Sequence, residues 1–128
     1  MKTFEINGNN FSNLKGFYDE VQKVLTDNST AIGRNFDAFN DVLQGGFGKF
    51  EHGESIELVW KNSKKTKKDL DYPETIRYLT YRVKHSNPDN VENYKRDLAE
   101  AENQNGATIF DVILMIIWDN KNVKLTLN

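Results

Sequence analysis

The chain has 128 residues, of which 38% are hydrophobic, and its 17 Lys and Arg residues against 19 Asp and Glu residues give a formal net charge of −2. This length fits one domain with a single buried core, and the nearly balanced charge argues against a general nucleic-acid binder, whose contact surface is normally basic. The absence of cysteine excludes a disulfide scaffold and a thiolate metal site.

The N-terminal part of the chain predicts one strand followed by two helices. Residues 2–7 alternate apolar and polar side chains up to an Asn-Gly turn, which is typical of a half-buried strand. Ser12 or Asn13 can cap the next helix, whose apolar residues recur at helical spacing as far as Leu25. A polar break at 27–30 then precedes a second, shorter helix, which the glycines at 45–48 end.

The second helix carries two acidic residues, Asp37 and Asp41, about one turn apart on its polar side. Its apolar residues gather on the opposite side: Phe36, Phe39, Val42 and Leu43. Like charges at this spacing destabilise a helix by roughly 0.2–0.5 kcal/mol. Charge spacing alone leaves two interpretations. Either this face binds a positively charged partner, or the carboxylate of Asp37 stabilises the helix through its dipole and Asp41 is simply solvated.

The remaining regular elements complete an α/β pattern. Residues 55–60 and 123–127 alternate like strands, with Trp60 expected to face the core. Residues 109–117 predict the last and most buried helix. Strands separated by helices favour parallel pairing through helical crossovers. The five lysines within 61–68 could touch phosphate, but we interpret them as a solvated helix face.

Residues 71–106 predict two amphipathic helices joined by a short turn. Pro73 and Pro88 stand near the expected helix starts. One apolar stripe runs along each helix, and we expect this helical hairpin to lay both stripes on the core. Four of the five tyrosines fall here, which can mark an interface, although we favour packing as their role.

No pattern in the chain points to catalysis, so we expect a protein that is not an enzyme and needs no cofactor or metal. His52 and His85 lack metal-ligand spacing. The glycines at 45–48 follow a helix and are not followed by the Ser or Thr of a phosphate-binding loop. Asp37 and Asp41 could form an acid/base pair, but an exposed helix face does not separate their pKa values.

Several motifs in order resemble the barstar family of ribonuclease inhibitors. They are Asn7-Gly8 after a strand, Gly33-x-Asn35-Phe36-Asp37-Ala38-Phe39-x-Asp41, Glu57-Leu58-Val59-Trp60 and a C-terminal strand. The run Gly45-Gly46-Phe47-Gly48, followed by Val59-Trp60-Lys61-Asn62-Ser63, is similar to the longer bacterial members. The resemblance covers 2–70 and 107–127. It implies a single α/β domain, 1–128, with a small three-stranded parallel sheet packed by helices and a helical hairpin inserted at about 71–106.

The resemblance also implies a function. Barstar-like proteins block the active-site cleft of a secreted microbial ribonuclease, because carboxylates of one helix occupy the places of RNA phosphates. Asp37 and Asp41 match the two acidic positions, Asp41 the deeper one, and Asn35, Asn40 and Gly45 fall in the same binding element. We therefore expect an immunity-type inhibitor of a basic ribonuclease or related toxin. It would be a cytoplasmic monomer that binds neither nucleic acid nor membrane, since it has no signal-peptide pattern and no apolar run long enough to cross a bilayer.

The chain departs from the family where partner-binding aromatic residues are expected. Ala31 stands in place of a tyrosine, and Asn40 and Gly46 stand in place of two tryptophans. Met115 falls where the family's best-known member has a glutamate. The partner should therefore differ from that member's nuclease. Two alternatives remain: a non-inhibitory interaction module that uses the tyrosine-bearing hairpin, and a regulator that contacts nucleic acid through the lysines of 61–68.

Overall fold

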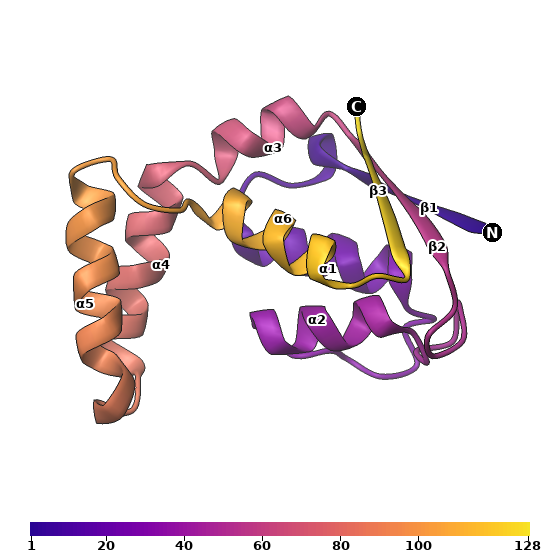
Figure 1. Ribbon diagram of the computed structural model, residues 1–128, viewed down its shortest axis with the longest axis horizontal. Coiled ribbons are helices and arrows are strands. Elements are labelled where there is room, and N and C mark those ends of the chain that lie inside the picture. The colour runs from indigo at the N-terminus through magenta and orange to yellow at the C-terminus, as the bar shows by residue number, and fades with distance from the viewer.

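The computed structural model describes residues 1–128 and shows a small sheet with the helices on one side of it (Figure 1). No helix combines the length and the apolar character that crossing a membrane requires. In chain order the elements are β1 (Lys2–Asn7), the one-turn 3-10 helix η1 (Gly8–Asn10), α1 (Leu14–Leu25), α2 (Phe36–Gln44), β2 (Ile56–Lys61), α3 (Ser63–Asp69), α4 (Tyr72–His85), α5 (Pro88–Glu102), α6 (Ile109–Asp119) and β3 (Val123–Leu127).

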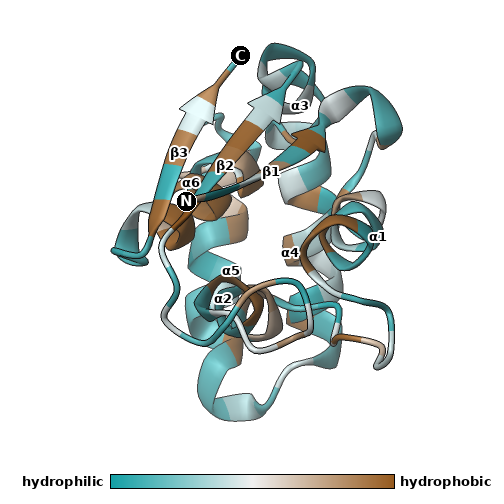
Figure 2. Ribbon diagram, turned by 90° about the vertical axis from the view of Figure 1, so that its right-hand side faces the viewer, coloured by the Kyte–Doolittle hydropathy of each residue, from teal (hydrophilic) through white to brown (hydrophobic).

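The three strands form one parallel sheet in the order β1-β2-β3, which confirms the predicted α/β fold (Figure 2). Because parallel strands need long crossovers, α1 and α2 connect β1 to β2, and α3 to α6 connect β2 to β3. In register, Trp60 of the central strand lies between Ile6 and Leu127. The inward residues of β2 are fully buried, as their alternation predicted: Ile56, Leu58 and Trp60.

An aromatic cluster joins the central strand to three of the helices. Phe17 of α1 stacks on Trp60, with ring centroids 5.6 Å apart, and meets Phe39 of α2 edge-on at 5.2 Å. Phe110 of α6 meets Trp60 edge-on at 5.5 Å. The Trp60 indole Nε1 donates a hydrogen bond of 3.2 Å to Thr66 Oγ1 of α3, which satisfies its buried N–H group. The cluster fixes the position of α2 against the sheet.

Helices α4 and α5 form the predicted helical hairpin, but the hairpin projects away from the sheet (Figure 1). The hydrophobic core contains no residue of α5, and Tyr78 is the residue of α4 that packs against it. Helices α4 and α5 pack against each other instead, and Leu79 of α4 and Ala101 of α5 are buried outside the core. The expectation that both stripes lie on the core was wrong, because each helix supplies the other with an apolar partner surface.

Polar contacts attach the base of the hairpin to the rest of the protein. The Glu74 carboxylate accepts a hydrogen bond of 2.8 Å from the Leu14 amide at the N-terminus of α1, where the helix dipole favours an anion. The Thr75 hydroxyl accepts a buried hydrogen bond of 3.0 Å from the Ile109 amide. These contacts place α4 beside the N-terminal ends of α1 and α6.

The basic helix α3 is only partly the solvated face that we expected. Lys64 is exposed. The Lys65 ammonium instead donates hydrogen bonds to the carbonyl oxygens of Gly8, at 3.0 Å, and Phe11, at 2.8 Å, and pairs with Asp69. The prediction was therefore wrong for Lys65, because its long side chain reaches backbone carbonyl groups at and after η1.

Candidate functional site

Helix α2 carries the predicted acidic residues, and its N-cap and its buried side hold it in place. Asn35 caps its N-terminus, where the side-chain Oδ1 accepts a hydrogen bond of 2.7 Å from the Ala38 amide. On the opposite side, Phe39, Val42 and Leu43 are fully buried. The predicted division of α2 into a polar and a core face is thus confirmed for these residues.

Asp37 and Asp41 both lie on the exposed side of α2. Neither carboxylate accepts a hydrogen bond, and no ion pair within 4.0 Å involves either of them. Asp37 is in the first turn and gains from the helix dipole, whereas Asp41 lies beyond it. The two residues form an accessible negative surface whose charge no cation of the chain neutralises at close range.

Asn40 and Gly45, also predicted at the site, have clear roles in the fold. The half-buried Asn40 accepts a hydrogen bond of 2.8 Å from Asn120 Nδ2, which links α2 to the end of α6. Gly45 is buried and has a φ of +90°, and a Cβ there would lie 2.3 Å from the Glu51 carbonyl oxygen. Both residue types are explained by contacts within the chain, while Asp37 and Asp41 are not.

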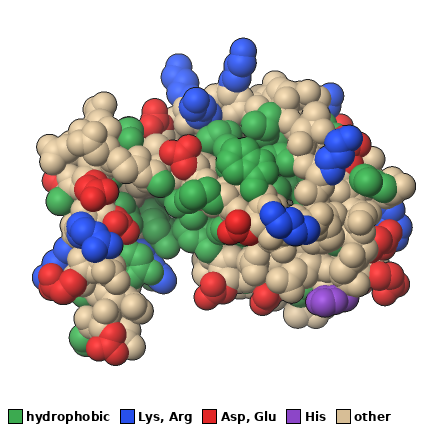
Figure 3. Space-filling model, viewed as in Figure 1, with side chains coloured by type: hydrophobic (Ala, Val, Ile, Leu, Met, Phe, Trp, Pro, Cys, Tyr) green, Lys and Arg blue, Asp and Glu red, His purple; other side chains and the backbone are tan.

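Helix α6 adds exposed hydrophobic side chains on the same side of the molecule, as the space-filling view shows over α6 (Figure 3). Met115 is 48% exposed and Trp118 is 57% exposed. A partner that extends from α2 over α6 would therefore meet apolar groups as well as carboxylates.

A groove of about 460 Å³ separates the hairpin from the N-terminal end of α2. Figure 3 shows that the surface between the hairpin and the rest of the protein is recessed and carries hydrophobic side chains. The Phe36 ring lies 6.3 Å from Tyr18 and 5.5 Å from Tyr78, measured between centroids, and so bridges the two walls. The groove is lined by Leu14, Lys15, Tyr18, Arg34, Asn35, Phe36, Asp37, Arg77, Tyr78, Tyr81, Arg82 and Tyr94.

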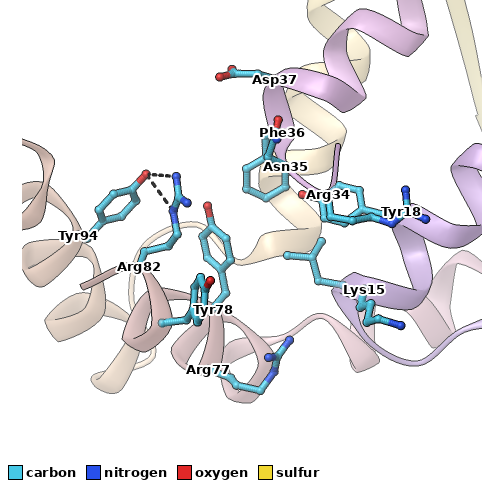
Figure 4. A pocket seen from close by; sticks show the side chains of 12 residues that line it. Lys15, Tyr18, Arg34, Asn35, Phe36, Asp37, Arg77, Tyr78, Arg82 and Tyr94 are labelled. Carbon is cyan, nitrogen blue, oxygen red and sulfur yellow. Dashed lines mark hydrogen bonds between the residues drawn. The ribbon is translucent and has the colours of Figure 1, made fainter. Parts of the chain in front are cut away.

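Sequence reasoning did not find this groove, because its walls come from segments that are distant along the chain. Its nearest signal was the tyrosine content of 71–106, which we had interpreted as packing. Tyr78 does pack against the core, but Tyr81 is 56% exposed at the groove. Figure 4 shows Tyr78 and Arg82 of α4 reaching into the space below Asp37.

Two phenol groups of the groove, those of Tyr18 and Tyr78, remain protonated at neutral pH because their pKa values are raised. Burial raises the pKa of Tyr18, and the neighbouring Tyr78 raises it further. Burial also raises the pKa of Tyr78, against the opposing effect of Arg82. Both hydroxyls can therefore donate hydrogen bonds into the groove.

Most cations that line the groove are paired with carboxylates. Arg34 forms an ion pair of 2.8 Å with Asp19, and Lys15 lies 3.9 Å from the same residue. Arg77 pairs with Glu74 at 2.6 Å. Arg82, by contrast, has no carboxylate partner, and donates from Nε and Nη2 to the hydroxyl of Tyr94 at 3.3 and 3.1 Å (Figure 4).

The family model described as Barstar (barnase inhibitor) matches residues 1–127. Searches of curated proteins and of solved structures gave no significant match. The family match includes both the acidic helix and the hairpin.

Proposed function

The chain belongs to the barstar family, and on this premise we propose that it is an immunity-type inhibitor that blocks the basic active site of a microbial ribonuclease or related toxin. Helix α2 is the inhibitory element. It acts in the cytoplasm of the producing cell, by occupying a site and without chemistry of its own. In this proposal residues 1–128 form one domain, in which the hairpin is an addition to the family's smallest form.

The observation that carries the proposal is the unpaired state of Asp37 and Asp41. Two carboxylates one turn apart destabilise a helix slightly, and no cation of the chain compensates them. The basic groups that hold RNA phosphates in a nuclease cleft would provide that compensation. Of the other residues assigned to the contact surface, Asn35 is exposed at the start of α2 and Asn40 is half-buried, while the buried Gly45 would contribute by forming the turn that ends α2.

The buried side of α2 keeps this surface in one position before the partner arrives. Binding then requires little ordering of the helix, so less of the interaction energy is lost to entropy. Opposite charges also steer the encounter, which raises the association rate and makes it sensitive to salt.

We test the proposal by measuring inhibition of purified microbial ribonucleases, barnase among them, with the wild-type protein and with Asp37→Asn and Asp41→Asn. Asp41→Asn should weaken inhibition at least about tenfold, equivalent to ~1.4 kcal/mol, and Asp37→Asn should weaken it less. Glu5→Gln removes the same charge from an exposed position on β1 and should change inhibition little.

Stopped-flow association at low and high ionic strength tests the mechanism. Salt should slow association strongly and change dissociation much less. An association rate that is indifferent to salt, or equal effects of Asp41→Asn and Glu5→Gln, would refute inhibition through α2.

A second candidate function is a non-inhibitory interaction module that uses the hairpin. The exposed Tyr81, at the groove rather than on the core, favours it. Binding of a partner that survives Asp41→Asn and is lost on Tyr81→Ala would support this alternative.

A further inference from the structure

Arg82 carries a positive charge that no acidic group of the chain balances at ion-pair distance. Its side chain is half-buried and lies over the rings of Tyr78, at 5.9 Å, and Tyr94, at 5.2 Å. Its side-chain hydrogen bonds go to the hydroxyl of Tyr94 and not to a carboxylate. Charges that are withdrawn from water are normally paired, so the position of Arg82 favours an external anion.

The hydroxyl groups around Arg82 point to the same kind of ligand. Tyr94 accepts hydrogen bonds from Arg82, so its own proton remains free to donate. The hydroxyl of Tyr18, which also lines the groove, makes no hydrogen bond within the protein. The ring of Tyr78 lies 5.9 Å from the guanidinium of Arg82. A carboxylate accepts several hydrogen bonds and donates none, and therefore matches a group of donors beside a guanidinium.

The groove lies within reach of any protein that covers α2. Asn35, Phe36 and Asp37 belong both to the start of α2 and to the wall of the groove. Helix α2 has 9 residues and is therefore only about 14 Å long. A stable interface covers about 800 Å² on each partner, which is more than one helix of this length provides. A partner seated on Asp37 and Asp41 thus extends over the mouth of the groove.

From these observations we infer that the groove receives an aspartate or glutamate side chain of the inhibited ribonuclease, with Arg82 as its ionic partner. This inference rests on the function proposed above. It defines a charge pattern for the partner, namely a basic cleft opposite Asp37 and Asp41 with an acidic residue at its edge. A ribonuclease with a lysine at that edge would be rejected, so the hairpin determines which nuclease the protein inhibits.

The test uses the full-length protein and the ribonuclease that it inhibits most tightly in the panel described above. Arg82→Gln should weaken binding about tenfold or more, mainly through faster dissociation. Arg96→Gln is the matched control, since it removes the same group from an exposed position on the same hairpin. It should change the affinity less than about twofold. Thermal melts of both variants and of Tyr94→Phe, which keeps the ring, show whether the hairpin remains folded.

A double-mutant cycle identifies the partner residue. Acidic residues at the edge of the nuclease cleft are changed in turn to the corresponding amide. One such change should weaken binding to the wild-type inhibitor and have little effect on binding to Arg82→Gln. Absence of any such coupling would overturn the inference.

The outcomes for Arg82 and Asp41 are separable. If Arg82→Gln behaves like Arg96→Gln while Asp41→Asn still weakens inhibition, the groove is not part of the interface although the proposed function stands. If the protein inhibits no ribonuclease, both proposals fail. If inorganic phosphate shifts the NMR signals of Arg82 and Tyr94, and Arg82→Gln inhibits like the wild type, the groove binds free anions and the inference is overturned.

Discussion

Replacing Lys65 with alanine tests whether α3 is a structural element or a solvated basic surface. The Lys65 ammonium links α3 to the carbonyl oxygens of Gly8 and Phe11, and it also pairs with Asp69. Lys64 is exposed and makes no hydrogen bond through its side chain. Lys64→Ala therefore removes the same charge from the same helix, with the same change in helix propensity, and serves as a matched control.

The two substitutions should differ clearly in their effect on the free energy of unfolding. Hydrogen bonds to charged groups contribute roughly 1.5–3 kcal/mol each. The Lys65 side chain is 39% exposed, so water can replace part of this contribution in the variant. We therefore expect a loss of roughly 2 kcal/mol for Lys65→Ala and a decrease in Tm of roughly 5–10 °C. Lys64→Ala should stay within about 0.5 kcal/mol of the wild type.

Urea unfolding followed by tryptophan fluorescence measures both values, because Trp60 is fully buried among aromatic rings and becomes exposed on unfolding. Equal stabilities of the two variants would show that the contacts around η1 contribute nothing, and would restore the interpretation of the lysines as a solvated face.

Phe39→Ala should destabilise the protein by roughly 3–5 kcal/mol, because the ring is fully buried against Phe17. The same urea assay measures the loss, and a stable variant would mean that the faces of α2 are assigned wrongly. Asp41→Ala should leave Tm unchanged or slightly raised, since it relieves a repulsion worth a few tenths of a kcal/mol. A decrease of several degrees in a thermal melt would make Asp41 a structural residue. Burial tends to raise the pKa of Glu74, but hydrogen bonds from Arg77 and the Leu14 amide prevail and hold it below its usual value. The ionised carboxylate therefore stabilises the fold at neutral pH, and this contribution is lost as the pH falls through the lowered pKa. Wild type and Glu74→Gln should thus differ most in stability near neutral pH and converge in acid, as urea unfolding at several pH values can show.

Local signals in the sequence predicted the elements well. Alternation and the Asn-Gly turn gave the bounds of β1 at Lys2 and Asn7, as observed. Pro73 and Pro88 stand in the first turns of α4 and α5, where the missing N–H group is tolerated. These features depend on neighbours in the chain, which a sequence displays directly.

Features that depend on distant segments could not be predicted in the same way. The apolar stripe of α5 indicated which of its residues would be buried. It did not indicate that α4, and not the core, would pack against them. A run of lysines shows charge, but not that Lys65 reaches carbonyl groups more than fifty residues away. The groove likewise needs Tyr18, Phe36 and Tyr78 to come together from three helices.

The acidic helix illustrates how stability and binding are divided between two faces of one element. Its buried face, its cap and the contact between Asn40 and Asn120 hold α2 in place without help from Asp37 or Asp41. The carboxylates are therefore free to carry a small repulsion that the fold tolerates and that a cationic partner would remove. If α2 binds a cationic partner as proposed, contact through charge alone would give fast association but a short-lived complex, since aromatic side chains are common binding hot spots and Asn40 stands where the resemblance to the family implies one. In the proposed complex, Arg82 and the tyrosines of the hairpin would supply a second contact beside α2, and this contact would slow dissociation.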